Sequence, residues 1–172
     1  EPRKLVVDPD YEILKIQKMP PRLWQHYDLD PEFIVIYGTL ADAHNNKSIA
    51  EQFTRKVLEY GREIIKADTD ANDADLTTKC VFLVGTSETN KVAQRFKDNF
   101  PIKFNGDQFV WKGMSYNKAA QGLAQVIEHP QNSQGLMIMY VGLSPGATKK
   151  FYNLSLYEAD ASYVIFDEDR EL

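Results

Sequence analysis

Cysteine, histidine and uninterrupted apolar sequence are all scarce in this chain of 172 residues. The single cysteine, Cys80, allows no internal disulfide, and it excludes neither the cytoplasm nor export because a domain of this length needs no cross-links. No apolar run approaches the roughly 18–20 residues that a membrane-spanning helix requires. The three histidines are scattered without an H-E-x-x-H motif, so we expect no metal site.

Basic charge is also in short supply. The 20 lysines and arginines are outnumbered by 25 aspartates and glutamates, which gives a net charge of −5. An acidic chain without a basic stripe is poorly suited to nucleic acid, so we expect no such partner. The residues that are present, 43% hydrophobic and 12% aromatic, are enough for one folded domain and exclude a disordered tail, a collagen-like repeat or a coiled coil.

Residues 1–31 differ in pattern from the rest of the chain. The double proline of Met19-Pro20-Pro21 breaks regular structure and stiffens the path of the chain. We interpret residues 1–31 as an N-terminal arm, a linker from a preceding domain, and residues 32–172 as one domain. The side chains expected to hold the arm against that domain are Leu23, Trp24 and Tyr27. The first residue is Glu1 and no signal peptide follows it, which predicts processing or excision from a longer protein.

Residues 32–172 alternate between strand-like and helix-like patterns. The β-branched run at 33–38 is typical of a strand buried on both faces, and apolar spacings of three and four predict a helix over 42–60. The later elements expected are strands at 63–67 and 80–85, a helix at 87–99, a hairpin of 102–104 with 108–111, strands at 122–128 and 136–141, a helix at 145–156 and a strand at 163–166. This order predicts a flavodoxin-like, three-layer α/β sandwich with a largely parallel central sheet. The sheet would contain 33–38, 80–85, 136–141 and 163–166, and residues 102–128 would form an antiparallel excursion.

Small polar residues follow glycine at three of the expected strand ends. Ligands of parallel sheets bind outside the carboxyl ends of the strands, so these residues predict a crevice there. Its lining would be Thr39, Asp42, Asn46, Thr86, Asn90 and Ser144. Helix capping by Asp42, Ser87 and Ser144 is the simpler explanation of the same residue types.

Two serines lie in sequences that resemble a nucleophile elbow, but neither predicts a hydrolase. Gly142-Leu143-Ser144-Pro145-Gly146 matches G-x-S-x-G, yet Pro145 has no N–H for an oxyanion and no histidine follows it. Ser87 precedes Asp107 and His129 in the required order, but its motif lacks the last glycine. We therefore expect no catalytic residue.

Cofactor motifs are missing as well. Neither G-x-x-x-x-G-K-[ST] nor G-x-G-x-x-G occurs, and Asp42 would repel a phosphate at the N-terminus of its helix. Residues 68–75 begin like a calcium loop, but Asp73 and Lys79 stand where an EF-hand has glycine and glutamate. We expect no nucleotide, no flavin or other cofactor, and no metal ion.

Aromatic residues gather around the expected hairpin. Phe104, Phe109, Trp111 and Tyr116 either pack onto the domain or form a contact surface, and the sequence leaves both interpretations open. The candidate interaction surface consists of Trp24, Phe109, Trp111 and Tyr116. We expect contacts with the rest of a parent protein to run through the arm and the hairpin rather than the crevice.

Several short motifs carry a resemblance. Val7-Asp8-Pro9-Asp10-Tyr11-Glu12-Ile13-Leu14 and Met19-Pro20-Pro21-Arg22-Leu23 resemble the junction after a catalytic or β-sandwich module in exported bacterial peptidases, of the aminopeptidase-type metallopeptidase kind, and related esterases. The motifs Tyr37-Gly38-Thr39, Lys66-Ala67-Asp68, Val84-Gly85-Thr86-Ser87-Glu88-Thr89-Asn90 and Tyr163-Val164-Ile165-Phe166-Asp167 resemble an uncharacterised α/β accessory domain appended to such enzymes.

The resemblance implies a non-catalytic accessory or interaction domain of a larger, exported bacterial hydrolase, periplasmic or extracellular. Its partners would be the neighbouring domains of the parent chain, and no catalytic residue is carried over. The alternative is a small-ligand-binding or enzymatic domain that uses the crevice.

Overall fold

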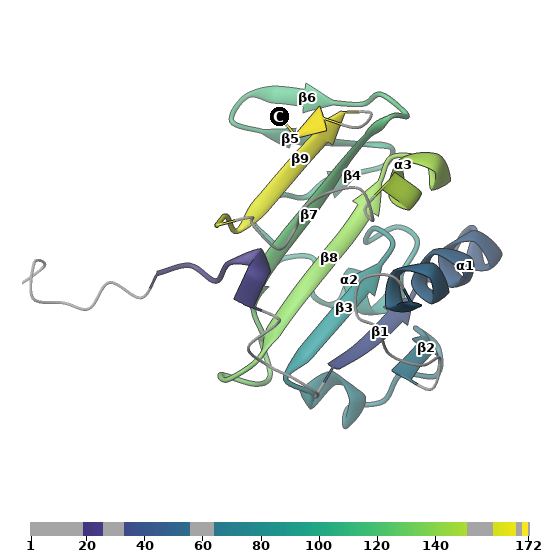
Figure 1. Cartoon of the computed structure of the whole chain (residues 1–172), viewed down its shortest axis with the longest axis vertical. Coiled ribbons are helices and arrows are strands. Elements are labelled where there is room, and N and C mark those ends of the chain that lie inside the picture. Colours follow the sequence, from purple (N-terminus) through teal and green to yellow (C-terminus); the bar gives the residue numbers. More distant parts are fainter. Residues whose placement is uncertain (1–18, 26–32, 56–63, 151–159, 168–169, 172) are drawn as a thin grey trace, which may run out of the picture.

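A seven-stranded mixed sheet runs through the protein in a computed structural model, which describes residues 19–25, 33–55, 64–150, 160–167 and 170–171 (Figure 1). In spatial order the strands are β10 (Arg170–Glu171), β9 (Tyr163–Asp167), β7 (Gln121–Glu128), β8 (Leu136–Gly142), β3 (Cys80–Val84), β1 (Phe33–Tyr37) and β2 (Ile65–Ala67). The neighbours β2, β1, β3 and β8 are parallel. The predicted α/β class is confirmed, and the four segments predicted for the central sheet all belong to it.

The strand β7 lies inside this sheet rather than in a separate excursion. It pairs antiparallel with β8 on one side and β9 on the other. A tight turn joins β7 to β8, in which His129 N donates to Gly135 O at 2.9 Å. Such a short connection allows only antiparallel pairing, which explains why the sheet is mixed.

Each face of the sheet has its own apolar core. On one face, α1 (Ala43–Phe53) and α3 (Pro145–Lys149) pack over side chains such as Phe82 and Tyr140. On the other, α2 (Lys91–Arg95) and a small antiparallel sheet cover Leu83 and Met139. The strands of the small sheet are β4 (Phe104–Asn105), β5 (Gln108–Trp111) and β6 (Met114–Tyr116). Since β3 and β8 are covered on both faces, their sequences are almost wholly apolar.

The helices differ from their predicted lengths. The first ends at Phe53 in a helical turn that continues to residue 55, and Val57, Tyr60 and Gly61 lie outside the described residues. The helix predicted over 87–99 is only Lys91–Arg95, because residues 86–90 close a turn of their own. The third begins at Pro145 as predicted, and residues 151–156 are not described. The predicted hairpin forms, but it gains β6, which the sequence pattern did not reveal.

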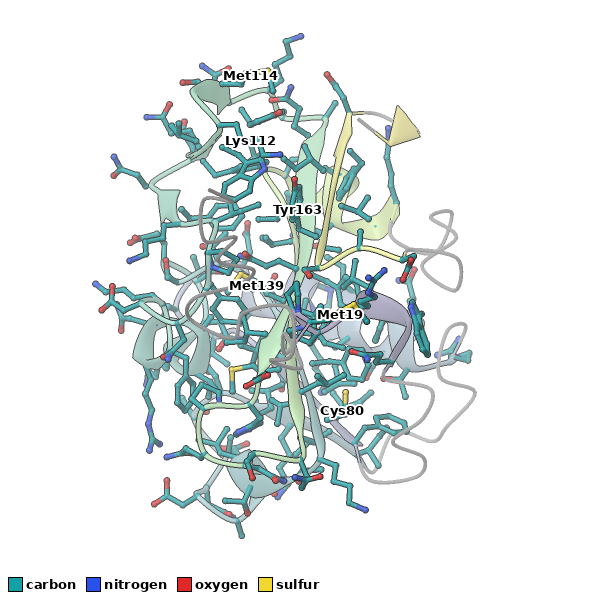
Figure 2. The ribbon with its side chains drawn as sticks, turned by 90° about the vertical axis from the view of Figure 1, so that its left-hand side faces the viewer. Met19, Cys80, Lys112, Met114, Met139 and Tyr163 are labelled. Carbon is teal, nitrogen blue, oxygen red and sulfur yellow. The ribbon has the colours of Figure 1, made fainter. Side chains whose placement is uncertain are left out.

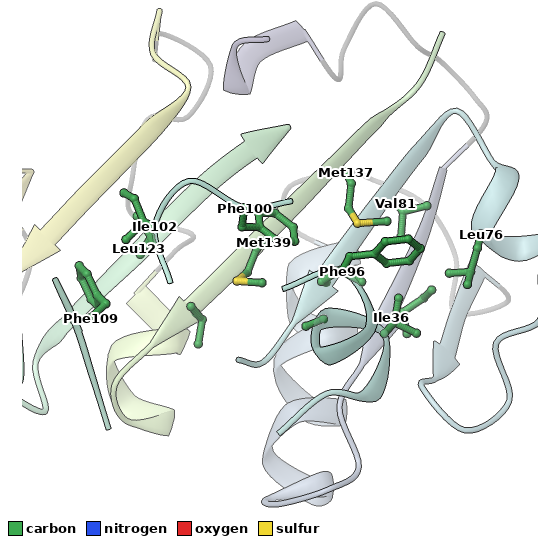
Figure 3. Close-up of a cluster of buried hydrophobic side chains, with 14 of the residues drawn as sticks. Ile36, Leu76, Val81, Phe96, Phe100, Ile102, Phe109, Leu123, Met137 and Met139 are labelled. Atoms are coloured by element: carbon green, nitrogen blue, oxygen red, sulfur yellow. The ribbon is translucent and has the colours of Figure 1, made fainter. Parts of the chain in front are cut away.

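A buried glutamine attaches the segment after α2 to the main sheet. Gln125, on β7, is fully buried. Its Oε1 accepts from Ile102 N at 3.1 Å, and its Nε2 donates to Ile102 O at 2.9 Å. Figure 3 shows Phe100 beside Met139 and Ile102 beside Leu123 in the core of this face. Gln125 therefore hydrogen-bonds this segment to the main sheet, and Phe100 and Ile102 pack it into the core.

The described end of the arm, residues 19–25, packs against the start of β9. Leu23 is fully buried in the first core, and its backbone N donates to Ala161 O at 2.9 Å. The Trp24 indole donates to the Asp160 carboxylate at 3.3 Å, and Arg22 forms an ion pair with the same carboxylate. Tyr27 lies outside the described residues. Leu23 thus holds the arm against the domain, as the sequence predicted, and it is part of the first core.

Candidate functional site

A pocket of about 230 Å³ lies at the carboxyl ends of β1, β3 and β8. Of the six residues predicted to line a crevice there, four do so: Asp42, Asn46, Thr86 and Ser144. Thr39 and Asn90 do not line it. The pocket is therefore where the topology of the parallel strands placed it, with a smaller set of side chains.

Glycines follow or end the three strands near this pocket. Gly85 follows β3 with φ 116°, a conformation that other residues rarely adopt. A Cβ on Gly142 would collide with the backbone of α3, since it would lie 2.6 Å from the carbonyl carbon of Ala147. On the far side of β1, a Cβ on Gly38 would lie 2.8 Å from the Cα of Asn90. These positions need glycine because backbone segments approach closely where the strands end.

Asn90 holds the strand ends together instead of facing a ligand. It is fully buried, and its Oδ1 accepts from Val92 N at 2.9 Å and Ala93 N at 3.0 Å. Its Nδ2 donates to Ile36 O and Val84 O, each at 3.1 Å. Asn90 is the N-cap of α2, and the prediction that Ser87 caps this helix is wrong. The reason is that the turn at residues 86–90, closed by the Asn90 N to Thr86 O bond at 2.9 Å, delays the start of the helix.

Thr39 belongs to a second structural network beside α2. Its hydroxyl donates to Asp68 Oδ1 at 2.6 Å, and Asp68 Oδ2 accepts from Lys91 N at 2.7 Å. Asp75, at the other end of the calcium-like segment, forms an ion pair with Lys66 at 2.6 Å. Both carboxylates therefore have structural partners, and in the described residues no group of three or more His, Cys, Asp or Glu could hold a metal ion.

Ser144 caps α3 as predicted. Its Oγ accepts from Ala147 N at 3.1 Å and donates to Ala119 O at 2.7 Å. Asp42 also occupies a capping position, at the start of α1, but its side chain makes no capping bond and its φ is 51°. The capping prediction is thus confirmed for Ser144 and wrong for Asp42, whose left-handed backbone turns the carboxylate away from the helix N–H groups.

The pocket is acidic. Its carboxylates are Asp42, Glu88 and Asp107, and among the described residues no lysine or arginine lines it. Asp107 and Gly106 come from the tip of the β4–β5 turn, so the hairpin reaches the strand ends. The crevice and the hairpin, which the sequence presented as competing surfaces, therefore meet at one place.

Asn46 provides the buried polar group of the pocket. Its Nδ2 donates to Gly38 O and Ala41 O, each at 3.0 Å. These bonds turn the Oδ1 of the same amide away from the backbone, and that oxygen has no hydrogen-bond partner among the described residues. An acceptor oxygen and three carboxylates suit a ligand that donates hydrogen bonds.

Ser87 and His129 lie at opposite ends of the sheet. Ser87 follows the carboxyl end of β3, whereas Glu128, next to His129, pairs with Leu136 at the amino end of β8. The length of a strand therefore separates them, and they cannot share a proton. His129 is buried, its Nδ1 accepts from Gln131 N at 3.0 Å, and burial lowers its pKa below the ordinary value.

The hairpin aromatics divide between core and surface. Phe109 is fully buried and stacks on Tyr116, with ring centroids 4.8 Å apart, so these two candidates pack onto the domain. Trp111 is half-buried against Tyr163. The exposed apolar side chains of the hairpin are Val110 and Met114, at 52% and 57%. Figure 2 shows Met114 and Lys112 at one end of the molecule. Alternation along β5 could have identified Val110, since it lies between two inward-facing aromatics.

Comparison with known proteins gives no family for this chain. No protein-family model, no curated protein and no solved structure matches it. Within the described residues, the helices are too short and too polar to cross a bilayer.

Proposed function

We propose that this chain is a non-catalytic accessory or interaction domain of a larger bacterial hydrolase. The observation that carries the proposal is that the side chains most suited to catalysis are held in structural roles or kept apart. The Ser144 hydroxyl is engaged at both its donor and its acceptor side. His129 lies a strand length away from Ser87, and burial raises the pKa of the Cys80 thiol, which keeps it unreactive. The hydrolase context and the exported location rest on the resemblance of the junction and strand-end motifs.

The surface proposed for contacts with neighbouring domains is the hairpin together with residues 19–25. Val110 and Met114 are exposed on the hairpin, and Met19, the first of residues 19–25, is 67% exposed. Exposed apolar side chains are what a neighbouring domain would cover. The sequence-based candidates Trp24 and Trp111 contribute their half-buried edges, and Phe109 and Tyr116 support the hairpin from below.

Hydrogen exchange tests this surface. We expect a longer parent chain to protect backbone amides at residues 110–115 and 19–25 relative to this 172-residue chain. Protection confined to residues 39–46 and 86–90 would contradict the proposal and would identify the strand-end pocket as the contact.

Activity assays test the absence of catalysis. We expect no turnover of nitrophenyl esters or aminoacyl anilides by this chain above the rate with Ser87→Ala. Turnover that Ser87→Ala abolishes, while Ser115→Ala retains it, would refute a non-catalytic role.

A second candidate function is the binding of a small ligand at the strand-end pocket. Its position favours this. The parallel strands β2, β1, β3 and β8 have the spatial order 2-1-3-4 of flavodoxin-like sheets, and the pocket lies at the carboxyl ends of β1 and β3, between which the strand order reverses. We propose the flavodoxin-like, three-layer classification on the same ground. The carboxylates of Asp42, Glu88 and Asp107 favour a ligand with a positively charged group.

Titration with alkylamines and with neutral alcohols of the same shape tests this candidate. Amines should shift the NMR signals of residues 85–89 and 142–144, and Asp42→Asn with Asp107→Asn should remove the shifts. Equal responses to amine and alcohol would contradict recognition by the carboxylates.

A further inference from the structure

A second pocket, of about 220 Å³, lies beside the turn between β3 and α2, on the face of the sheet that α2 and the small sheet cover. The turn contributes Ser87 and Glu88, and the segment after α2 contributes Lys97, Phe104 and their neighbours. Met139 of β8 forms part of its lining, and Figure 3 shows this side chain beside Phe100. None of the roles described above uses this pocket.

Ser87 is the polar group inside it. The residue is 6% exposed, and neither its hydroxyl nor its backbone N–H makes a hydrogen bond with any residue that the structure describes. Neighbouring polar groups of the same turn are satisfied, since Glu88 N donates to the Thr86 hydroxyl at 3.1 Å and Thr86 N to the Thr89 hydroxyl at 2.9 Å. Unlike the buried and unpartnered Trp111 Nε1 and His129 Nε2, the Ser87 hydroxyl is reached by solvent, so it is free to donate a hydrogen bond to a ligand in this pocket.

Two opposite charges at the pocket also lack partners. Glu88 and Lys97 both line it as exposed side chains, and neither forms an ion pair with the other or with any described residue. The remaining charges of the lining, Asp98 and Lys103, neutralise each other in an ion pair at 3.2 Å. A ligand that carries one positive and one negative group would therefore find a complementary charge for each.

The rest of the pocket is apolar and small. Met139, Phe100 and Ile102 are almost fully buried behind it, and Phe104 is half-buried at its side. A volume of about 220 Å³ accommodates a molecule the size of a free amino acid.

We propose that this pocket binds a free amino acid with an apolar side chain. The carboxylate accepts hydrogen bonds from Ser87 and lies near the Lys97 ammonium, the α-ammonium group faces Glu88, and the side chain lies against Phe104 and Met139. This pocket shares Glu88 with the strand-end pocket, and its other lining residues belong to it alone.

Titration of the full 172-residue chain with L-leucine, followed by calorimetry and NMR, tests the proposal. Leucine should bind saturably and shift the amide signals of residues 87–88 and 97–104. Ser87→Ala should weaken binding about tenfold or more, since a hydrogen bond to a charged group is lost. Lys97→Gln should also weaken it, whereas Lys149→Gln and Ser115→Ala, at exposed positions outside the pocket, should leave the Kd unchanged.

Analogues separate the contributions of the two charges. Leucine methyl ester lacks the carboxylate and 4-methylpentanoate lacks the amine, so each should bind at least about tenfold more weakly than leucine. The proposal is overturned if leucine does not bind, if its shifts occur only at residues 42–46 and 142–144, or if 4-methylpentanoate binds as tightly as leucine. Because Ser87 makes no hydrogen bond with the part of the chain that the structure describes, Ser87→Ala should keep the thermal midpoint of the parent chain. An unchanged Kd for that variant also overturns the proposal.

Discussion

At the scale of single residues, Asn90 determines how the strand ends meet. It joins the last carbonyls of β1 and β3 to the first N–H groups of α2 through four hydrogen bonds. Removal of the amide leaves the N–H groups of Val92 and Ala93 without the Asn90 acceptor, at a cost of about 1–3 kcal/mol each, whereas Val84 O still accepts from Gly38 N at 3.0 Å.

Asn90→Ala should therefore lower the free energy of unfolding by about 2–4 kcal/mol, which includes the loss of a helix cap worth about 0.5–2 kcal/mol. Urea denaturation measures this change. Asn117→Ala, at an exposed asparagine, is the matched control and should remain within about 0.5 kcal/mol of the parent chain. A loss below 1 kcal/mol for Asn90→Ala would show that water replaces the side chain.

The pH dependence of stability should reveal His129. Burial lowers its pKa in the folded protein, and its Nε2 is buried without a hydrogen-bond partner. The unfolded chain therefore takes up the proton first as the pH falls. The contribution of neutral His129 is fully present above its ordinary pKa of about 6.5, and it is lost progressively as the pH falls from that value to the folded pKa.

We expect the free energy of unfolding to decrease between pH 7 and pH 5, and His129→Gln to reduce that slope. His44→Gln, at an exposed position on α1, controls for a general effect of losing a histidine. Identical slopes for the parent chain and His129→Gln would contradict a buried, neutral imidazole.

Residue type alone could not separate these roles. A small polar residue after a strand is typical of both a ligand contact and a helix cap. Asn90 proved to be a cap, Asn46 lines the pocket, and Ser144 does both. Ser87 was recognisable only as a polar residue in a motif. Its lack of a partner depends on the turn around it, which the sequence pattern assigned to a helix.

At the scale of elements, one side chain makes the hydrogen bonds between β7 and the segment after α2. Gln125 bonds to both backbone groups of Ile102, and Met139 Sδ lies 3.7 Å from its amide nitrogen. Gln125→Met keeps much of the volume but removes both bonds.

This variant should destabilise the protein by about 2–4 kcal/mol, because two buried backbone groups lose their partners. Hydrogen exchange should show faster exchange at residue 102 and at the neighbouring hairpin than on β3. Gln134→Met, at an exposed turn position, should change neither. Equal loss of protection across both regions would indicate that the segment is not a separate unit of stability.

The strand pattern predicted the elements better than their arrangement. Runs of apolar, β-branched residues located β1, β3, β8 and β9. The position of β7 could not be read from the same signal, because Gln121–Glu128 is buried throughout most of its length and its sequence does not record which neighbours it pairs with. The predicted length of α2 was wrong for another reason. Local side-chain hydrogen bonds of Thr86, Thr89 and Asn90 compete with helix formation before residue 91.

At the scale of the whole molecule, the two faces of the sheet should unfold together. The chain has two tryptophans, and they report on different faces: Trp24 follows Leu23 of the first core, and Trp111 packs against the second. Since β3 and β8 contribute side chains to both cores, neither core can be lost alone.

Fluorescence of Trp24→Phe and Trp111→Phe should therefore follow urea transitions that coincide with the loss of circular dichroism in the same variant. A transition of the Trp24 signal at lower urea would show that residues 19–25 behave as a separate arm. Such a result would support the domain boundary at residue 31 that the sequence suggested.

The central position of β3 has a consequence for synthesis of the protein. β3 pairs with β1, which is synthesised earlier. It also pairs with β8, which is synthesised much later, after α2, the small sheet and β7. Pairing of such distant segments is slow, and a nascent chain carries β3 with one unpaired apolar edge until residue 142 has left the ribosome. Translation of residues 85–142 is therefore the interval in which this chain is most exposed to aggregation and would gain most from a chaperone.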